Sequence, residues 1–226
     1  MFRAIVFDIG QTLVEYHKPL SWAKLYRPAL KDMAARCGYT FSEKQYQHAV
    51  GVLTKYNTRM NPRDYEVSST QIFTELLDGT DVPGEDMERM KYYFYNWFRQ
   101  GACVFWEVEK TLKILSQRGV LLGTLSDVAY AMDNVYALGD IASVIKYIDY
   151  PLTSNDVGFR KPRAEGLWLL SRLMGVAREE TAFVGDEEKD IRCAQNAGVH
   201  AILINRTGTP KHYGQEREIR SLSELL

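Results

Sequence analysis

Two short apolar runs, each closing on aspartate, constrain the fold of this chain more than any other feature. Ala4–Phe7 runs directly into Asp8, and Thr181–Val184 is followed two residues on by Asp186 and then by Asp190. Short, continuous apolar runs are typical of parallel strands buried on both faces. Because ligands bind at the carboxyl ends of such strands, the pattern predicts that the three aspartates share one pocket.

Carboxylates that share a pocket repel one another. Two unit charges 4 Å apart cost about 4 kcal/mol at an effective dielectric constant of 20. A cation removes this cost, and a site built only of oxygen ligands favours Mg²⁺. The alternative, for each aspartate taken alone, is a turn residue at the end of a strand.

Composition places the chain among ordinary globular proteins and argues against two classes of partner. It has 226 residues, of which 46% are hydrophobic and 25% charged, with a formal net charge of −1. The lack of a basic excess argues against nucleic acid as a partner. No apolar stretch approaches the roughly 18 residues of a membrane span.

The cysteines and the N-terminal residues indicate the cellular compartment in which the protein is expected to reside. Cys37, Cys103 and Cys193 form no metal-ligand spacing and are predicted to be small buried residues of a reducing compartment. The chain enters a strand almost at once, without the pattern of a signal peptide. We therefore expect a cytoplasmic protein.

Residues 16–100 have helical spacing, many aromatic residues and no strand alternation. Ser42 and Gln45 predict a capping box at the start of one helix, with Phe41 and Tyr46 as its hydrophobic staple. The region is predicted to form four helices, within 21–37, from 42 onward, 67–77 and 84–100.

From residue 108 onward, helical and strand patterns alternate, which predicts an α/β fold with a parallel, doubly wound sheet. The predicted strands are 120–125, 150–153, 181–184 and 200–204, and the predicted helices are 109–118, 130–138, 164–174 and 190–196. The tail from 207 to 215 is expected to be a loop, with a last short element at 221–226.

Four motifs now stand in order along the chain. They are D-I-G-Q-T-L at 8–13, L-S-D at 125–127, R-K-P at 160–162 and G-D-E-E-K-D at 185–190. This set resembles the haloacid dehalogenase (HAD) superfamily, most of whose members are Mg²⁺-dependent phosphatases. The resemblance implies a Rossmann-like core of residues 1–15 and 101–226, with a four-helix cap domain of residues 16–100 inserted after the first motif.

The resemblance also implies roles for residues of this chain. Asp8 would be the nucleophile that forms an aspartyl-phosphate, and a carboxylate suits this because it attacks without prior deprotonation. Ser126 would bind a phosphoryl oxygen, and Lys161 would neutralise the charge of the nucleophile and of the transferred group. Asp186 would bind Mg²⁺ directly, while Asp190 would bind it through water or hold Lys161 in place.

Two further positions belong to the candidate site. Asp127 belongs to the candidate phosphate-binding group, although a helix cap is the commoner role for a residue in its place. Gly10 stands where the family's phosphatases have a second aspartate, which protonates the leaving group and contributes typically about 10²–10⁴-fold. Gly10 retains the backbone carbonyl that this position offers to the metal, so it is included among the metal ligands.

Three functions therefore remain open. The first is a phosphatase of small phosphorylated metabolites that is slow or limited to good leaving groups. The second is a catalytically weak binding or regulatory protein with the same fold, since fold alone does not fix function. The third is a metal-independent 2-haloacid dehalogenase, against which the Gly185-Asp186 pair argues.

Little in the sequence identifies the substrate. The segment Arg59–Arg63 carries two cations, and a solvated loop is the favoured interpretation over contact with an anionic substrate. No pattern indicates an oligomeric state.

Overall fold

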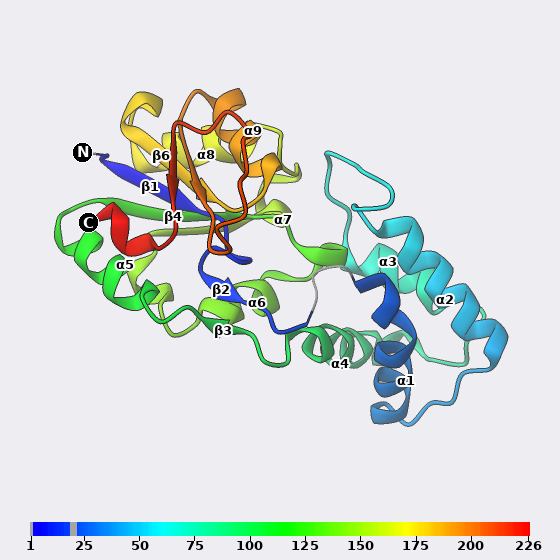
Figure 1. Cartoon of the computed structure of the whole chain (residues 1–226). Coiled ribbons are helices and arrows are strands. Elements are labelled where there is room, and N and C mark those ends of the chain that lie inside the picture. Colours follow the sequence, from blue (N-terminus) through cyan, green and yellow to red (C-terminus); the bar gives the residue numbers. More distant parts are fainter. Residues whose placement is uncertain (1, 19–21) are drawn as a thin grey trace.

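The computed structural model describes residues 2–18 and 22–226, and its centre is a six-stranded sheet (Figure 1). The order across the sheet is β5-β4-β1-β6-β7-β8, and all neighbouring strands are parallel. The strands are β1 (Ala4–Phe7), β4 (Leu121–Ser126), β5 (Tyr150–Thr153), β6 (Thr181–Gly185), β7 (His200–Ile204) and β8 (Arg217–Ile219). The predicted parallel α/β sheet is confirmed, and the two strands that precede Asp8 and Asp186 are direct neighbours.

Helices cover both faces of this sheet, which is why its central strand is apolar throughout. Ile5 and Phe7 pack into one apolar layer with α5 (Val108–Gln117). Ala4 and Val6 pack into the opposite layer with α8 (Glu165–Met174) and α9 (Glu188–Ala197). A strand buried on both faces cannot alternate polar and apolar residues.

Four α-helices between residues 26 and 99 form a second group, beside the sheet rather than on it (Figure 1). They are α1 (Tyr26–Arg36), α2 (Glu43–Tyr56), α3 (Ser69–Leu76) and α4 (Met87–Arg99). The capping box of α2 is present, because the Gln45 N–H donates to Ser42 Oγ (3.3 Å) and the Ser42 N–H donates to Gln45 Oε1 (2.8 Å). The rings of Phe41 and Tyr46 lie 5.5 Å apart, centroid to centroid.

This helical group has an apolar core of its own, and the loop after β4 joins it. Val128, Tyr130, Ala131 and Met132 pack among side chains of α1 to α4. A short antiparallel ribbon, β2 (Val14–Glu15) with β3 (Cys103–Val104), lies where the chain leaves the sheet for the helices and returns.

The remaining elements are short. They are η1 (Trp22–Leu25), η2 (Gly84–Asp86), η3 (Ala129–Ala131), α6 (Asn134–Ala137), η4 (Leu138–Ile141), η5 (Ile145–Tyr147), α7 (Ser154–Val157), η6 (Arg178–Glu180) and η7 (Leu222–Leu225). Within the described ranges, no helix is both long enough and apolar enough to pass through a bilayer.

The structure corrects two expectations about secondary structure. The predicted helix 130–138 is instead broken into η3, α6 and η4. Tyr130 and Ala131 have φ angles of 51° and 52°, in the left-handed region, and so cannot continue a right-handed helix. Strand β8 was not predicted, because three residues with two charges carry no clear strand pattern.

A third correction concerns the cysteines and the start of the first helix. Cys37 and Cys193 are buried as expected, but Cys103 is exposed on the edge ribbon. Pro28 lies in the first turn of α1, where its missing N–H breaks no hydrogen bond within the helix. Ser21, at the start of the predicted helix 21–37, lies outside the described residues.

Candidate active site

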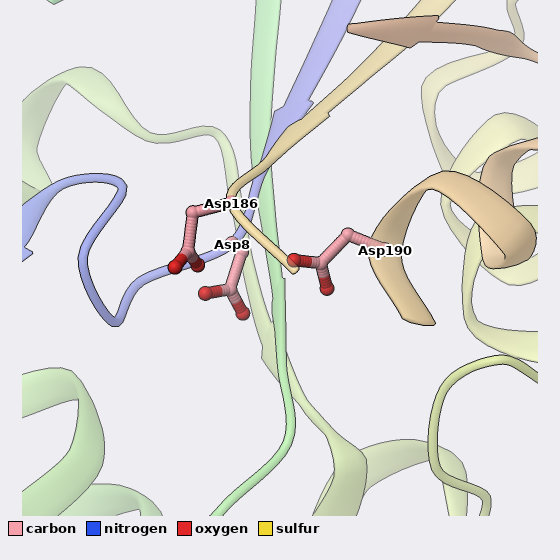
Figure 2. A group of neighbouring side chains, drawn as sticks. All are labelled: Asp8, Asp186 and Asp190. Atoms are coloured by element: carbon pink, nitrogen blue, oxygen red, sulfur yellow. The ribbon is translucent and has the colours of Figure 1, made fainter. Parts of the chain in front are cut away.

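The three predicted aspartates meet at the carboxyl edge of the sheet (Figure 2). Asp8 follows β1, Asp186 follows β6, and Asp190 lies in the first turn of α9. Each offers a carboxylate oxygen, and these three oxygens lie within 4.8 Å of one another. Because β1 and β6 are hydrogen-bonded neighbours, their tips cannot separate without breaking the sheet.

Lys161 joins two of these carboxylates. Its Nζ lies 2.6 Å from Asp8 Oδ1 and 2.6 Å from Asp190 Oδ1, and its side chain is 1% exposed. Burial lowers the pKa of Lys161, but the carboxylates of Asp190, Asp8 and Asp127 raise it by more, so it lies well above its usual range. The ammonium is therefore a fixed positive charge beside Asp8.

The third carboxylate, that of Asp186, has no such partner among the described residues. Burial, followed by the charges of Asp8 and Asp190, raises its pKa to about 8. Burial also raises the pKa of Asp8, to about 6, against the opposing effect of Lys161. Three carboxylates around one ammonium leave an excess of negative charge that a bound cation would neutralise, and oxygen ligands of this kind suit a hard divalent ion.

Gly185 allows α9 to approach the tip of β6. A Cβ at this position would lie 2.4 Å from the Cβ and 2.5 Å from the Cγ of Asp190, closer than real contacts permit. Asp190 Oδ2 also accepts a hydrogen bond from the Glu187 N–H (2.9 Å), which caps the helix. The side chain of Asp190 is thus held from two sides and directed at Lys161.

Asp127 does not cap a helix, contrary to the interpretation favoured from sequence. Its Oδ1 accepts the backbone N–H of Lys161 (3.0 Å), and its Oδ2 lies 3.1 Å from Lys189 Nζ. Although burial raises its pKa, Lys189, Lys161 and Arg160 together lower it to about 2. Asp127 therefore anchors the loop that carries Lys161.

Ser126 and Gly10 complete the predicted set. Ser126 is the last residue of β4 and lines the same cavity as Asp8. A Cβ placed on Gly10 would lie 3.7 Å from the ring of Tyr16 and 3.9 Å from Asp8 Oδ2, which is ordinary contact. The missing side chain at position 10 is thus not imposed by lack of space for a Cβ.

A cavity of about 160 Å³ lies between this sheet edge and the helical group. Arg59 lines it and pairs with Glu187 across the two parts of the protein, at 2.6 Å. Arg63 is buried rather than solvated and pairs with Glu66 at 3.4 Å. The expectation of a solvated loop is therefore wrong for Arg63, and Arg59 contributes to the cavity wall.

Two groups at the site were not found from sequence. Arg206, just after β7, donates to the carbonyl oxygens of Gln11 (3.2 Å) and Thr12 (2.7 Å) and so holds the loop after Asp8. Tyr16 donates to Asp140 (2.6 Å) on the cavity wall. Neither has a sequence signature, because each contact joins segments more than 100 residues apart.

Comparison with known proteins agrees with this architecture. A family model described as haloacid dehalogenase-like hydrolase matches residues 2–198. Phosphoglycolate phosphatase of Escherichia coli (strain K12) is 28% identical over 127 residues, which are 54% of this chain and 50% of that protein. The enzyme of the same name from Pectobacterium atrosepticum is 30% identical over 123 residues, 52% of this chain and 50% of its own length. The chain thus spans about half the length of the curated relatives it matches.

Solved structures share the fold over the whole chain. A 2-haloacid dehalogenase from Pseudomonas syringae has a TM-score of 0.70 at 22% identity and covers 100% of this chain and 96% of its own. A HAD phosphatase from Thermococcus onnurineus has a TM-score of 0.64 at 23% identity, over 99% and 95% of the two chains. With the family match and the ordered motifs, these findings show that the chain belongs to the haloacid dehalogenase-like hydrolase family.

Proposed function

We propose that this protein is a Mg²⁺-dependent hydrolase of small phosphomonoesters that acts through an aspartyl-phosphate on Asp8. The observation that carries this proposal is the carboxylate of Asp186, which faces Asp8 without a cationic partner among the described residues. A metal-free mechanism leaves ionisation of that carboxyl disfavoured, since burial and the charges of Asp8 and Asp190 raise its pKa to about 8, whereas a bound cation would compensate its charge. The phosphatase names of the curated relatives agree with the proposal.

Asp8 and Asp186 would hold Mg²⁺, together with the backbone carbonyl of Gly10. The ion supplies positive charge to the oxygens of the phosphoryl group, which is the principal catalytic need in phosphoryl transfer. Asp190 acts at one remove, because its pair with Lys161 positions that ammonium.

The protein's own groups then act as follows. Asp8 attacks phosphorus with a carboxylate oxygen, the bond to the leaving oxygen breaks, and an aspartyl-phosphate remains. Lys161, 2.6 Å from Asp8, shares its positive charge with the transferred group. Ser126 donates its hydroxyl to a phosphoryl oxygen. Water then hydrolyses the aspartyl-phosphate and regenerates Asp8.

The step that lacks a dedicated group is protonation of the leaving oxygen. Gly10 has no side chain, and Asp127 is a poor substitute, because neighbouring cations lower its pKa to about 2 and its oxygens already pair with Lys161 and Lys189. We expect turnover to favour leaving groups that need no proton.

We further propose that residues 16–100 act as a cap over a core of residues 1–15 and 101–226. The Arg59–Glu187 pair, which joins the two parts at the cavity wall, supports this division. A cap that closes over the cavity excludes water from the aspartyl-phosphate until the leaving group has departed.

Phosphate release from acetyl phosphate, p-nitrophenyl phosphate and alkyl phosphomonoesters, with Mg²⁺ and with EDTA, tests the proposal. We expect release that EDTA and Asp8→Asn both abolish, while the exposed Asp78→Asn serves as a matched control with full activity. Halide release from a 2-haloacid that EDTA does not affect would instead identify a dehalogenase. If no compound releases phosphate or halide, a binding or regulatory function is favoured.

A further inference from the structure

Part of the wall of the cavity that contains Asp8 is aromatic. Trp22, Phe98 and Tyr130 line it, and they come from three different elements. The rings of Trp22 and Phe98 stack with centroids 3.8 Å apart and planes 4° apart, and Trp22 and Tyr130 stack at 5.1 Å and 22°. The three rings stack on one another, are only 2–8% exposed, and line the same cavity as Asp8.

This wall is held rigidly. Tyr130 has a left-handed backbone, a conformation that is unfavourable for a residue with a Cβ. Its carbonyl accepts a hydrogen bond from the Tyr95 hydroxyl (2.8 Å), and its own hydroxyl pairs with that of Tyr26. Strain of this kind persists only where the surroundings enforce it, and it gathers at ligand sites.

The arginines that line the cavity, Arg59, Arg99 and Arg160, are paired with carboxylates, Arg160 with Glu66. Arg59 pairs with Glu187 at 2.6 Å, and Arg99 pairs with Asp140 at 2.8 Å. Lys18 donates to Gln100 Oε1 (3.1 Å), and its ammonium lies 3.4 Å from the centre of the Trp97 ring. Among the described residues, the wall therefore offers no arginine without a carboxylate partner to a second anionic group on the substrate.

Gly10 is a second, independent observation that bears on the leaving group of the substrate. Without an acidic side chain at position 10, the leaving oxygen is expected to depart as an anion. A phenol loses its proton near pH 10, as tyrosine does, whereas water, the reference for an unactivated hydroxyl, has a pKa of about 15.7. An aryl oxygen departs unprotonated far more readily than an alkyl oxygen.

We propose that the site selects small aryl phosphates, with the aromatic ring seated against Trp22, Phe98 and Tyr130. This rests on the proposed phosphatase function. The volume of about 160 Å³, lined by Asp8 and Ser126 as well as by the three rings, leaves room for no more than one small ring beside the phosphoryl group. In the reaction, Asp8 forms the new oxygen–phosphorus bond, and the aryl oxygen leaves with the electron pair as phenolate. The phenolate takes its proton from water after release.

Binding of non-hydrolysable probes tests the proposal without turnover. In titration calorimetry with Mg²⁺ present, we expect phenylphosphonate to bind wild-type protein at least 10-fold more tightly than phosphonoacetate, which carries a carboxylate in place of the ring. Phe98→Leu should reduce this preference about 5-fold or more. Phe94→Leu is the matched control, because Phe94 lies on the same helix in the same apolar core but does not line the cavity.

The outcomes separate the two proposals. Equal binding of the two probes, tighter binding of phosphonoacetate, or an equal loss of preference in both variants overturns the aryl selectivity. Hydrolysis of acetyl phosphate that needs Mg²⁺ and Asp8, alongside any of those results, leaves the phosphatase proposal standing. An aryl preference with no turnover of any ester supports the site for a ring and refutes the phosphatase.

Discussion

The carboxylate of Asp186, which has no cationic partner among the described residues, is expected to make the stability of this protein depend on pH and on Mg²⁺. Burial and the charges of Asp8 and Asp190 raise its pKa to about 8 in the folded state, whereas a solvated aspartate has a pKa of about 3.9. The folded protein therefore holds this proton more tightly than the unfolded chain. The stabilisation is complete below about pH 4 and is lost as the pH rises toward about 8.

The structure sets the size of this effect. Between pH 5 and pH 8, three pH units at about 1.36 kcal/mol each give an upper bound of about 4 kcal/mol. Asp186 retains partial exposure, and solvent screening reduces the effect. We expect the free energy of unfolding of wild-type protein in EDTA to fall by about 2–3 kcal/mol more than that of Asp186→Asn over this range. The comparison removes the similar contribution of Asp8, whose pKa is also raised.

Urea denaturation at pH 5 and pH 8 measures this difference, with and without Mg²⁺. At pH 8, an ion at 100 times its dissociation constant should stabilise the wild type by about 2.7 kcal/mol and Asp186→Asn by far less. Asp78→Asn, at an exposed position away from the cavity, should behave as wild type. Equal pH dependence of wild type and Asp186→Asn in EDTA would refute the reasoning, and so would equal stabilisation of both by Mg²⁺.

Three further substitutions test how the site is held. Lys161→Met leaves the carboxylates of Asp8 and Asp190 without their shared cation. The free energy of unfolding at pH 7, measured by urea denaturation, should therefore fall by about 3–5 kcal/mol. A decrease below about 1 kcal/mol would contradict the pairing. Gly185→Ala places a Cβ 2.4 Å from that of Asp190. We therefore expect the free energy of unfolding to fall by about 1–3 kcal/mol and Mg²⁺ to bind more weakly in calorimetry. Unchanged Mg²⁺ binding would show that α9 moves to accommodate the Cβ. Arg206→Ala removes the donor to two carbonyl oxygens of the loop after Asp8. The free energy of unfolding should fall by about 1.5–3 kcal/mol, as for hydrogen bonds to a charged donor, and amide hydrogen exchange in that loop should accelerate. Unaltered exchange would argue against this role of Arg206.

The substitution Gly10→Asp tests the missing acid directly. The space beside Gly10 admits a Cβ, so the variant should fold and should raise the rate on alkyl phosphates by more than the rate on acyl phosphates. An acid assists only leaving groups that must be protonated. Equal increases for both ester classes, in parallel rate measurements, would contradict this role for position 10.

Local sequence patterns were sufficient to predict secondary structure where the residues of one element alone determine it. The strands 150–153 and 200–204 and the capping box at Ser42 depend on runs of a few residues, and the structure has them as predicted. The segment 130–138 was mispredicted because Tyr130 takes its left-handed conformation from contacts with Tyr26 and Tyr95, which lie far away in the chain.

The sequence by itself determined the parallel sheet and the position of Asp8, Asp186 and Asp190 at its carboxyl edge, because buried strands have a recognisable apolar pattern and end where the aspartates begin. Only the tertiary structure decided which charges pair. Lys161 could serve one carboxylate or two, and Asp127 could cap a helix or anchor a loop, until the packing of distant segments fixed the distances. The aromatic wall likewise exists only where three elements converge, since stacking depends on positions in space rather than on order along the chain.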